Sequence, residues 1–147
     1  MTDFHQVTDL ISVAPQISEE DIDRAAADGV KLIICNRPDG EEAGQPPLAE
    51  LKAHAAAKGI PLVLIPIASG QFTLDAVQQM AASLKEADGA KVLAYCRSGT
   101  RSCVLWAMAE AYTKGLSTDE LIERGAAAGY DLAPMAAMFE NLRAMEA

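Results

Sequence analysis

The chain has 147 residues, of which 50% are hydrophobic and 22% are charged, the size and balance of one folded globular domain over residues 1–147. Its 12 basic and 21 acidic residues give a formal net charge of −9, which argues against a nucleic acid or an anionic membrane as a partner. An odd number of cysteines favours free thiols in a reducing compartment, and residues 1–10 lack the pattern of a secretory signal. We therefore expect a cytoplasmic protein.

Short apolar runs alternate with amphipathic segments along the chain. Buried strands are expected over residues 30–35, 61–67 and 91–96, and a shorter edge strand over residues 10–13. Helix start and stop signals fall between these runs, because Ser18 and Gly29 bound one segment, Pro47 and Gly59 a second, and Thr73 begins a third. This alternation predicts a parallel sheet with helical crossovers.

The last third of the chain is expected to be helical. One helix follows Cys96 and ends near Gly115, Ser117 begins a second with a capping box, and Asp131 caps a last one that carries Pro134 in its first turn. The fold class is therefore α/β, with three layers and a central, mainly parallel sheet of four or five strands flanked by helices. In such sheets, ligands bind beyond the carboxyl ends of the strands.

One strand end carries a candidate active site. Residues 92–96 deliver Cys96 directly into the loop Arg97-Ser-Gly-Thr-Arg101-Ser102, after which a helix begins. A strand, a turn containing glycine and a helix start direct several backbone N–H groups at one small volume, which favours a bound anion. The same amides and two arginines favour the thiolate form of Cys96. Cys96 is therefore the expected nucleophile.

The other loop residues have distinct expected roles. Gly99 lets the backbone approach the ligand, and Arg97, Ser98 and Thr100 complete the anion-binding loop with it. Arg101 presents a planar fork that suits a tetrahedral oxyanion, and the Ser102 hydroxyl is expected to hydrogen-bond the sulfur. Arg97 is equally well explained as a solvated surface charge.

Three residues after other strand ends are candidate accessory groups. Cys35 ends a parallel strand and could resolve an oxidised or persulfidated Cys96, although a small buried core residue explains it more simply. Asp39 and Glu41 lie in a loop that is either a plain turn or a source of a proton-donating carboxyl.

His5 and His54 lack metal-ligand spacing with each other and with the cysteines, so we expect no metal. We also expect no cofactor.

These residues also carry a family resemblance. Cys96-Arg-Ser-Gly-Thr-Arg-Ser102 resembles the active-site loop of rhodanese sulfurtransferases. The stretches at residues 9–18, 30–41 and 65–67 resemble the dual-specificity phosphatase scaffold, and residues 7–138 as a whole are similar to its bacterial branch, the β-lactamase-hydrolase-like phosphatase domain. The resemblance implies a phosphatase-like fold and a partner domain of metallo-β-lactamase fold that handles persulfides.

The chain departs from the phosphatase pattern in three places. Arginine stands at position 101 and serine at 102, so the loop is one residue shorter, and Tyr95 replaces the histidine before the cysteine. Residues 68–73 lack the general-acid aspartate, and Asp75 is better explained as a residue of a helix first turn. Loss of a positioned acid slows the cleavage of phosphate esters, whereas transfer of sulfane sulfur needs no acid.

The sequence therefore predicts group transfer through a covalent intermediate on Cys96, with a small anionic sulfur or phosphate compound as the substrate. Sulfur transfer through a cysteine persulfide is placed narrowly ahead of phosphomonoester hydrolysis through a phosphocysteine. A third hypothesis is a non-catalytic or regulatory module that binds anions. It is weakened because anion binding alone does not require a thiolate.

Overall fold

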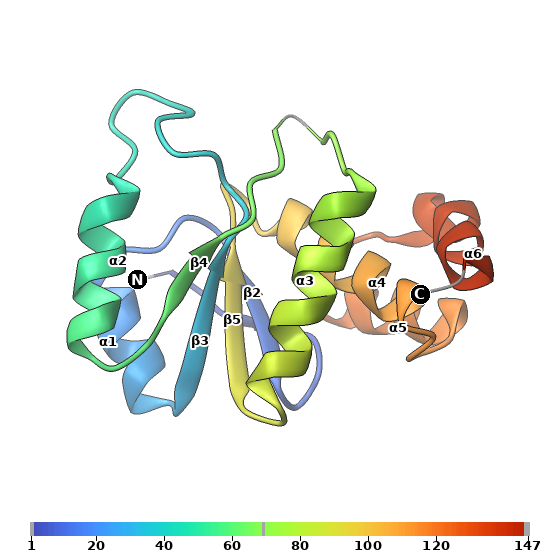
Figure 1. Ribbon diagram of the computed structural model, residues 1–147, viewed down its shortest axis with the longest axis horizontal. Coiled ribbons are helices and arrows are strands. Elements are labelled where there is room, and N and C mark those ends of the chain that lie inside the picture. Colours follow the sequence, from blue (N-terminus) through green and yellow to red (C-terminus); the bar gives the residue numbers. More distant parts are fainter. Residues whose placement is uncertain (1, 69, 146–147) are drawn as a thin grey trace.

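The computed structural model describes residues 2–68 and 70–145, and its centre is a five-stranded sheet (Figure 1). The strands are β1 (His5–Gln6), β2 (Ile11–Ala14), β3 (Val30–Cys35), β4 (Leu62–Leu64) and β5 (Lys91–Tyr95). They lie in the order β1-β2-β5-β3-β4, in which β1 runs antiparallel to β2 and every other neighbouring pair is parallel. The expected mainly parallel α/β sheet is confirmed.

Helices cover both faces of this sheet. They are α1 (Glu19–Ala27), α2 (Leu48–Ala57), α3 (Leu74–Ala87), α4 (Thr100–Tyr112), α5 (Thr118–Ala127), the 3₁₀ turn η1 (Ala133–Met135) and α6 (Ala136–Ala144). α1 and α2 lie on one side, whereas α3 and α4 lie on the other with α5 and α6 beyond them (Figure 1). Among the described residues, the helices are too short or too polar to cross a lipid bilayer.

Local capping signals explain where three of the helices, α1, α3 and α5, begin. Ser18 and Ser117 each form a reciprocal capping box, with Asp21 and Glu120 respectively, and the Thr73 hydroxyl accepts the Ala76 N–H. Pro47 occupies the cap position of α2 and has no side-chain hydrogen bond to offer there. These starts agree with the sequence, because each depends on residues within one helical turn.

Three expected elements need correction. Residues 10–13 do not form an edge strand, because β1 adds to the outer side of β2. The strand expected over residues 61–67 is only three residues long, and Pro61 and Pro66 stand close to its two ends. The Asp131 side chain accepts the Ala133 N–H at 3.2 Å, but this contact begins the 3₁₀ turn η1, and α6 starts only at Ala136.

The carboxyl ends of β2, β3 and β5 meet at one edge of the sheet. Residues Ala14 and Tyr95 are register partners there, as are Cys35 and Tyr95. The connections that follow β3 and β4 rise beyond this same edge (Figure 1). α4 leaves the edge as an almost entirely buried helix, so the loop between β5 and α4 is anchored in the core at both ends.

Candidate active site

Cys96 lies at the point where β5 gives way to the loop, and its side chain is fully buried. Its N–H donates to the Ala14 carbonyl at 3.2 Å, which ties the loop to the end of β2. The Gly99 N–H donates to Cys96 Sγ at 3.1 Å. Gly99 adopts φ +93°, which L side chains rarely adopt, and it caps the amino end of α4. The sulfur therefore faces a backbone donor at a helix start, as expected from the sequence.

Arg101 lies beside this sulfur in the first turn of α4, but its fork is already engaged. Its Nη1 and Nη2 donate to the two carboxylate oxygens of Glu41 at 2.8 and 2.9 Å. Nη1 also donates to the Ile67 carbonyl at 2.6 Å. A carboxylate of the protein itself thus occupies the guanidinium that was expected to bind a substrate oxyanion.

The loop after β3 brings a second arginine to the same carboxylate. Arg37 is buried, and its Nε donates to Glu41 Oε1 at 3.0 Å while its Nη1 donates to Gln16 at 3.0 Å. Glu42 lies 3.5 Å from Arg37 and 3.2 Å from Arg97. Since the Arg97 side chain is 66% exposed, its pairing with Glu42 is a surface contact.

The ionisation of Glu41 follows from these neighbours. The hydrogen bond from Arg101, and secondarily that from Arg37, lowers the pKa of Glu41 from 4.5 to about 2. A carboxylate in this arrangement carries no proton to donate at neutral pH. Glu41 therefore fits an ion-pairing role here better than the proton-donating role considered from the sequence.

Ser102 does not bond to the sulfur as expected. Its hydroxyl donates to Asn36 Oδ1 at 2.8 Å, and the Asn36 amide donates in turn to the Ile65 carbonyl at 2.9 Å. Both Ser102 and Asn36 are fully buried. Because a buried amide oxygen needs a donor, Asn36 takes the hydroxyl that the sequence assigned to Cys96.

The remaining candidates lie around this centre. Asp39 accepts the Leu48 N–H at 3.0 Å, so it serves the start of α2. Burial raises the pKa of Cys35, whose thiol donates to the Arg37 carbonyl at 3.2 Å. Ser98 and Thr100 lie at the exposed rim, where their side-chain oxygens are 3.1 Å apart. The role of Cys35 as a resolving thiol stays a prediction.

Several residues of this site were missed or undervalued from the sequence: Gln16, Asn36, Arg37, Glu42 and Tyr130. The dense run of charged residues after β3, next to a strand end, was the available signal for two of them. Tyr130 had none, because it reaches the loop from a distant connection. Among the residues that the structure describes, no three His, Cys, Asp or Glu side chains gather to hold a metal ion.

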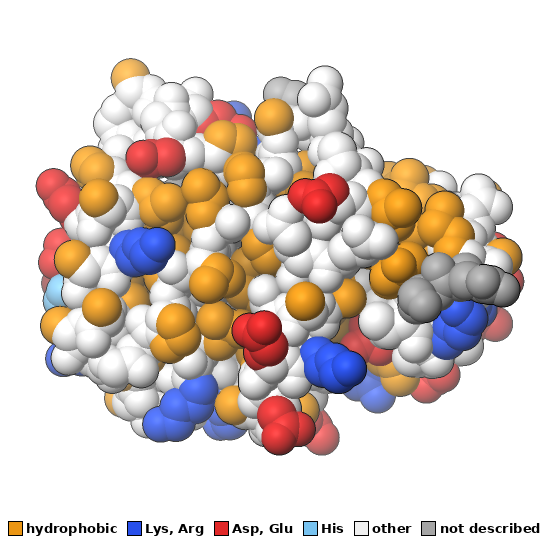
Figure 2. All heavy atoms as spheres, viewed as in Figure 1, with side chains coloured by type: hydrophobic (Ala, Val, Ile, Leu, Met, Phe, Trp, Pro, Cys, Tyr) orange, Lys and Arg blue, Asp and Glu red, His pale blue; other side chains and the backbone are white. Residues whose placement is uncertain are grey.

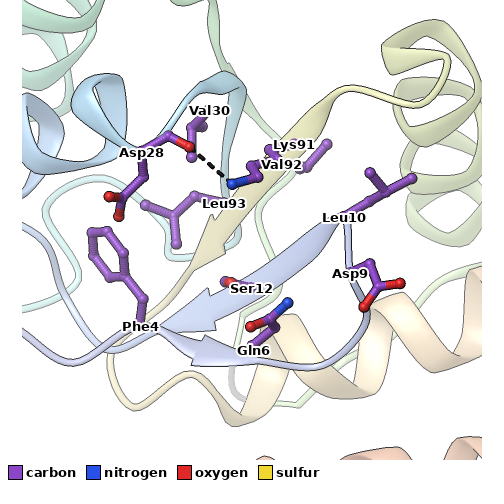
Figure 3. A pocket seen from close by; sticks show the side chains of 10 residues that line it. All are labelled: Phe4, Gln6, Asp9, Leu10, Ser12, Asp28, Val30, Lys91, Val92 and Leu93. Carbon is purple, nitrogen blue, oxygen red and sulfur yellow. Dashed lines mark hydrogen bonds between the residues drawn. The ribbon is translucent and has the colours of Figure 1, made fainter.

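A pocket at the opposite end of β5 is separate from this site. It is lined by residues of β1, β2 and the amino ends of β3 and β5, and the Lys91 amine donates to the Asp28 carbonyl at 3.0 Å on its wall (Figure 3). Its charged groups, Asp9, Asp28 and Lys91, do not converge on one point (Figure 3). This pocket therefore offers no competing set of converging side chains, and the carboxyl edge of the sheet, where ligands of such sheets bind, keeps the candidate active site.

Comparison with known families identifies this scaffold. The model of the phosphatase-like domain of β-lactamase hydrolase-like proteins matches residues 3–113. The chain belongs to this family of phosphatase-like domains. A β-lactamase hydrolase-like protein of Agrobacterium fabrum is 32% identical over 127 residues, which are 86% of this chain and 29% of that protein. The chain thus spans less than a third of the curated relative's length.

Solved structures agree with this assignment. A candidate phosphatase from Neisseria meningitidis is 33% identical, covers 94% of this chain and 96% of its own, and superposes with a TM-score of 0.78. Kinase associated phosphatase, at 16% identity, covers 100% of this chain and 97% of its own with a TM-score of 0.76, and therefore shares the fold. The family is one of phosphatase-like domains, and it supports the phosphatase alternative better than the sulfur transfer that the sequence placed first.

Proposed function

We propose that the chain hydrolyses phosphate monoesters through a phosphocysteine on Cys96. The observation that carries this proposal is the Gly99 N–H directed at the Cys96 sulfur beside the Arg101 guanidinium, on a scaffold of the phosphatase-like family. The loop amides and Arg101 would hold the three terminal oxygens of the phosphate. The odd number of cysteines in the sequence supports a reducing compartment such as the cytoplasm.

The reaction proceeds in two displacements. The Cys96 thiolate attacks phosphorus, so an S–P bond forms while the ester P–O bond breaks and its electron pair leaves with the alcohol oxygen. Water then attacks the phosphocysteine, which releases inorganic phosphate and returns the electron pair to sulfur as a thiolate. Proton transfer to the leaving oxygen falls to water, because residues 65–73 contain no carboxyl and Glu41 is held ionised.

This arrangement favours substrates whose leaving group needs little protonation. Aryl phosphates, phosphotyrosine included, release a phenolate, which is a comparatively stable anion, whereas seryl and alkyl phosphates release a much more basic alkoxide. We therefore infer a preference for aryl over alkyl phosphate monoesters. The test is a series of substituted phenyl phosphates, for which log(kcat/KM) should fall steeply as the leaving-group pKa rises.

Two variants complete the test. Cys96→Ser should abolish turnover, while Cys103→Ala, at a fully buried position in the first turn of α4, should retain it. Intact mass under rapid quench should show one added phosphoryl group on the wild-type protein and none on Cys96→Ser. Equal rates on phosphoserine and phosphotyrosine peptides would contradict the absence of an acid.

Sulfur transfer is the second candidate, favoured by the shorter loop and by the missing carboxyl in residues 65–73. In this reaction the thiolate attacks the outer sulfur of thiosulfate, an S–S bond forms, and sulfite leaves with the electron pair of the broken bond. Incubation with thiosulfate should then add one sulfur atom to Cys96, and cyanide should remove it as thiocyanate. Such a persulfide would make a metallo-β-lactamase-fold domain a fitting partner, and its formation without any phosphoenzyme would reverse the order proposed here.

A further inference from the structure

Tyr130 touches the Cys96 loop from outside the part of the chain that the family model matches. It lies between α5 and η1, and its hydroxyl donates to the Ser98 carbonyl at 3.2 Å. The His5 ring packs edge-on against the Tyr130 ring, with centroids 5.7 Å apart. β1 and the α5–η1 connection therefore hold the tyrosine over the loop.

The contact with Ser98 has a direct geometric effect on Gly99. The Ser98 carbonyl and the Gly99 N–H belong to one planar trans peptide unit, so they point in opposite directions. Tyr130 Oη binds the carbonyl end of this unit, and Cys96 Sγ accepts from its N–H end at 3.1 Å. A hydrogen bond that fixes the direction of the Ser98 carbonyl therefore also fixes the direction of the Gly99 N–H.

We propose that Tyr130 is a positioning residue for Cys96, which acts by orienting and polarising the Ser98–Gly99 peptide unit so that its N–H stabilises the thiolate. This inference rests on the proposed function in taking Cys96 as the nucleophile. A donor on the carbonyl makes the same unit a better N–H donor, because hydrogen bonds in a chain polarise one another.

Two further observations agree with this role. Burial raises the pKa of Tyr130 to about 12, so its hydroxyl remains a donor throughout the neutral and mildly alkaline range. The space beside Gly99 is also closed, since a Cβ there would lie 2.1 Å from Tyr130 Oη and 3.3 Å from the Ala14 carbonyl carbon. Glycine and tyrosine at these two positions fit each other.

The test is Tyr130→Phe, which keeps the ring and removes only the hydroxyl. Alkylation of Cys96 by iodoacetamide is followed by peptide mass mapping at about pH 6 and about pH 9.5. Loss of the Tyr130 hydrogen bond should lower the ratio of the alkylation rate at pH 6 to the rate at pH 9.5 about threefold, because less of Cys96 is then thiolate at pH 6. Tyr112→Phe is the matched control and should leave the ratio unchanged. Tyr112 is at the end of α4 far from the loop, and its hydroxyl accepts from Gln78 of α3.

A second measurement needs neither alkylation nor turnover. Hydrogen exchange of the Gly99 amide, read by NMR, should accelerate about threefold in Tyr130→Phe and not in Tyr112→Phe. Unchanged exchange and an unchanged rate ratio would refute the role of Tyr130, as would equal slowing of alkylation at both pH values, which signals altered access alone. If these readouts respond while the protein cleaves no phosphate ester, the proposed function fails and the positioning role stands.

Discussion

Glu41 and Arg101, sixty positions apart in the chain, form a two-point ion pair with N–O distances of 2.8 and 2.9 Å. Arg37 Nε also donates to this carboxylate, at 3.0 Å from Oε1. Any substrate oxyanion that uses the Arg101 fork must therefore displace a carboxylate that is already in place. The loop after β3 acts as an internal competitor of the ligand.

Removing this competitor should tighten anion binding. In Glu41→Gln we expect vanadate and inorganic phosphate to bind about fivefold more tightly, because the partly exposed ion pair is worth about 1 kcal/mol. Calorimetric titration measures the dissociation constants. Glu42→Gln removes an equal charge from the same loop without touching Arg101, and an equal gain in that variant would mean that only the overall charge matters.

The same ion pair predicts a pH dependence of stability. The folded protein lowers the pKa of Glu41 from 4.5 to about 2, so the carboxylate contributes stability that is complete above 4.5 and is lost as pH falls toward 2. Urea unfolding should therefore show that the stability difference between wild type and Glu41→Gln shrinks across this window. A difference that stays constant with pH would contradict the pairing.

Arg101→Lys keeps the charge and loses the fork. We expect binding of vanadate or thiosulfate to weaken by about 1–3 kcal/mol, since an ammonium group cannot offer two parallel donors to an oxyanion. Arg124→Lys on the exposed side of α5 is a matched control. Unchanged affinity in Arg101→Lys would show that the anion binds elsewhere.

Ser102→Ala tests the buried contact that replaced the expected bond to sulfur. Its loss leaves Asn36 Oδ1 without the donor at 2.8 Å, and an unsatisfied buried acceptor costs about 1–3 kcal/mol of unfolding free energy. Ser98→Ala removes an exposed hydroxyl and should change stability by less than about 0.5 kcal/mol. Equal unfolding midpoints for the two variants would mean that the hydrogen bond between Ser102 and Asn36 does not contribute to stability.

The sequence correctly predicted those structural features that depend on residues close together in the chain. The strand β5, the glycine turn and the start of α4 are encoded within residues 91–103, so Cys96 was recognised as the candidate nucleophile. The two-residue strand β1 was missed because so short a pairing leaves no periodic pattern.

Contacts between distant segments could not be read in this way. Tyr130 meets Ser98 from 32 positions away, and Ser102 meets Asn36 from 66. Each contact depends on how whole helices and strands pack together, so no residue spacing in the sequence predicts it. The preference for Asn36 over the sulfur arises only because burial leaves an amide oxygen that must find a donor.

Both margins of the sheet are poor templates for another strand. β4 offers three residues between Pro61 and Pro66, and β1 offers only two. An incoming chain therefore finds few unpaired backbone groups in register, and the two prolines supply no N–H to extend the ladder. A domain with such short, proline-flanked sheet edges can therefore be present at high local concentration beside other sheets without edge-to-edge aggregation.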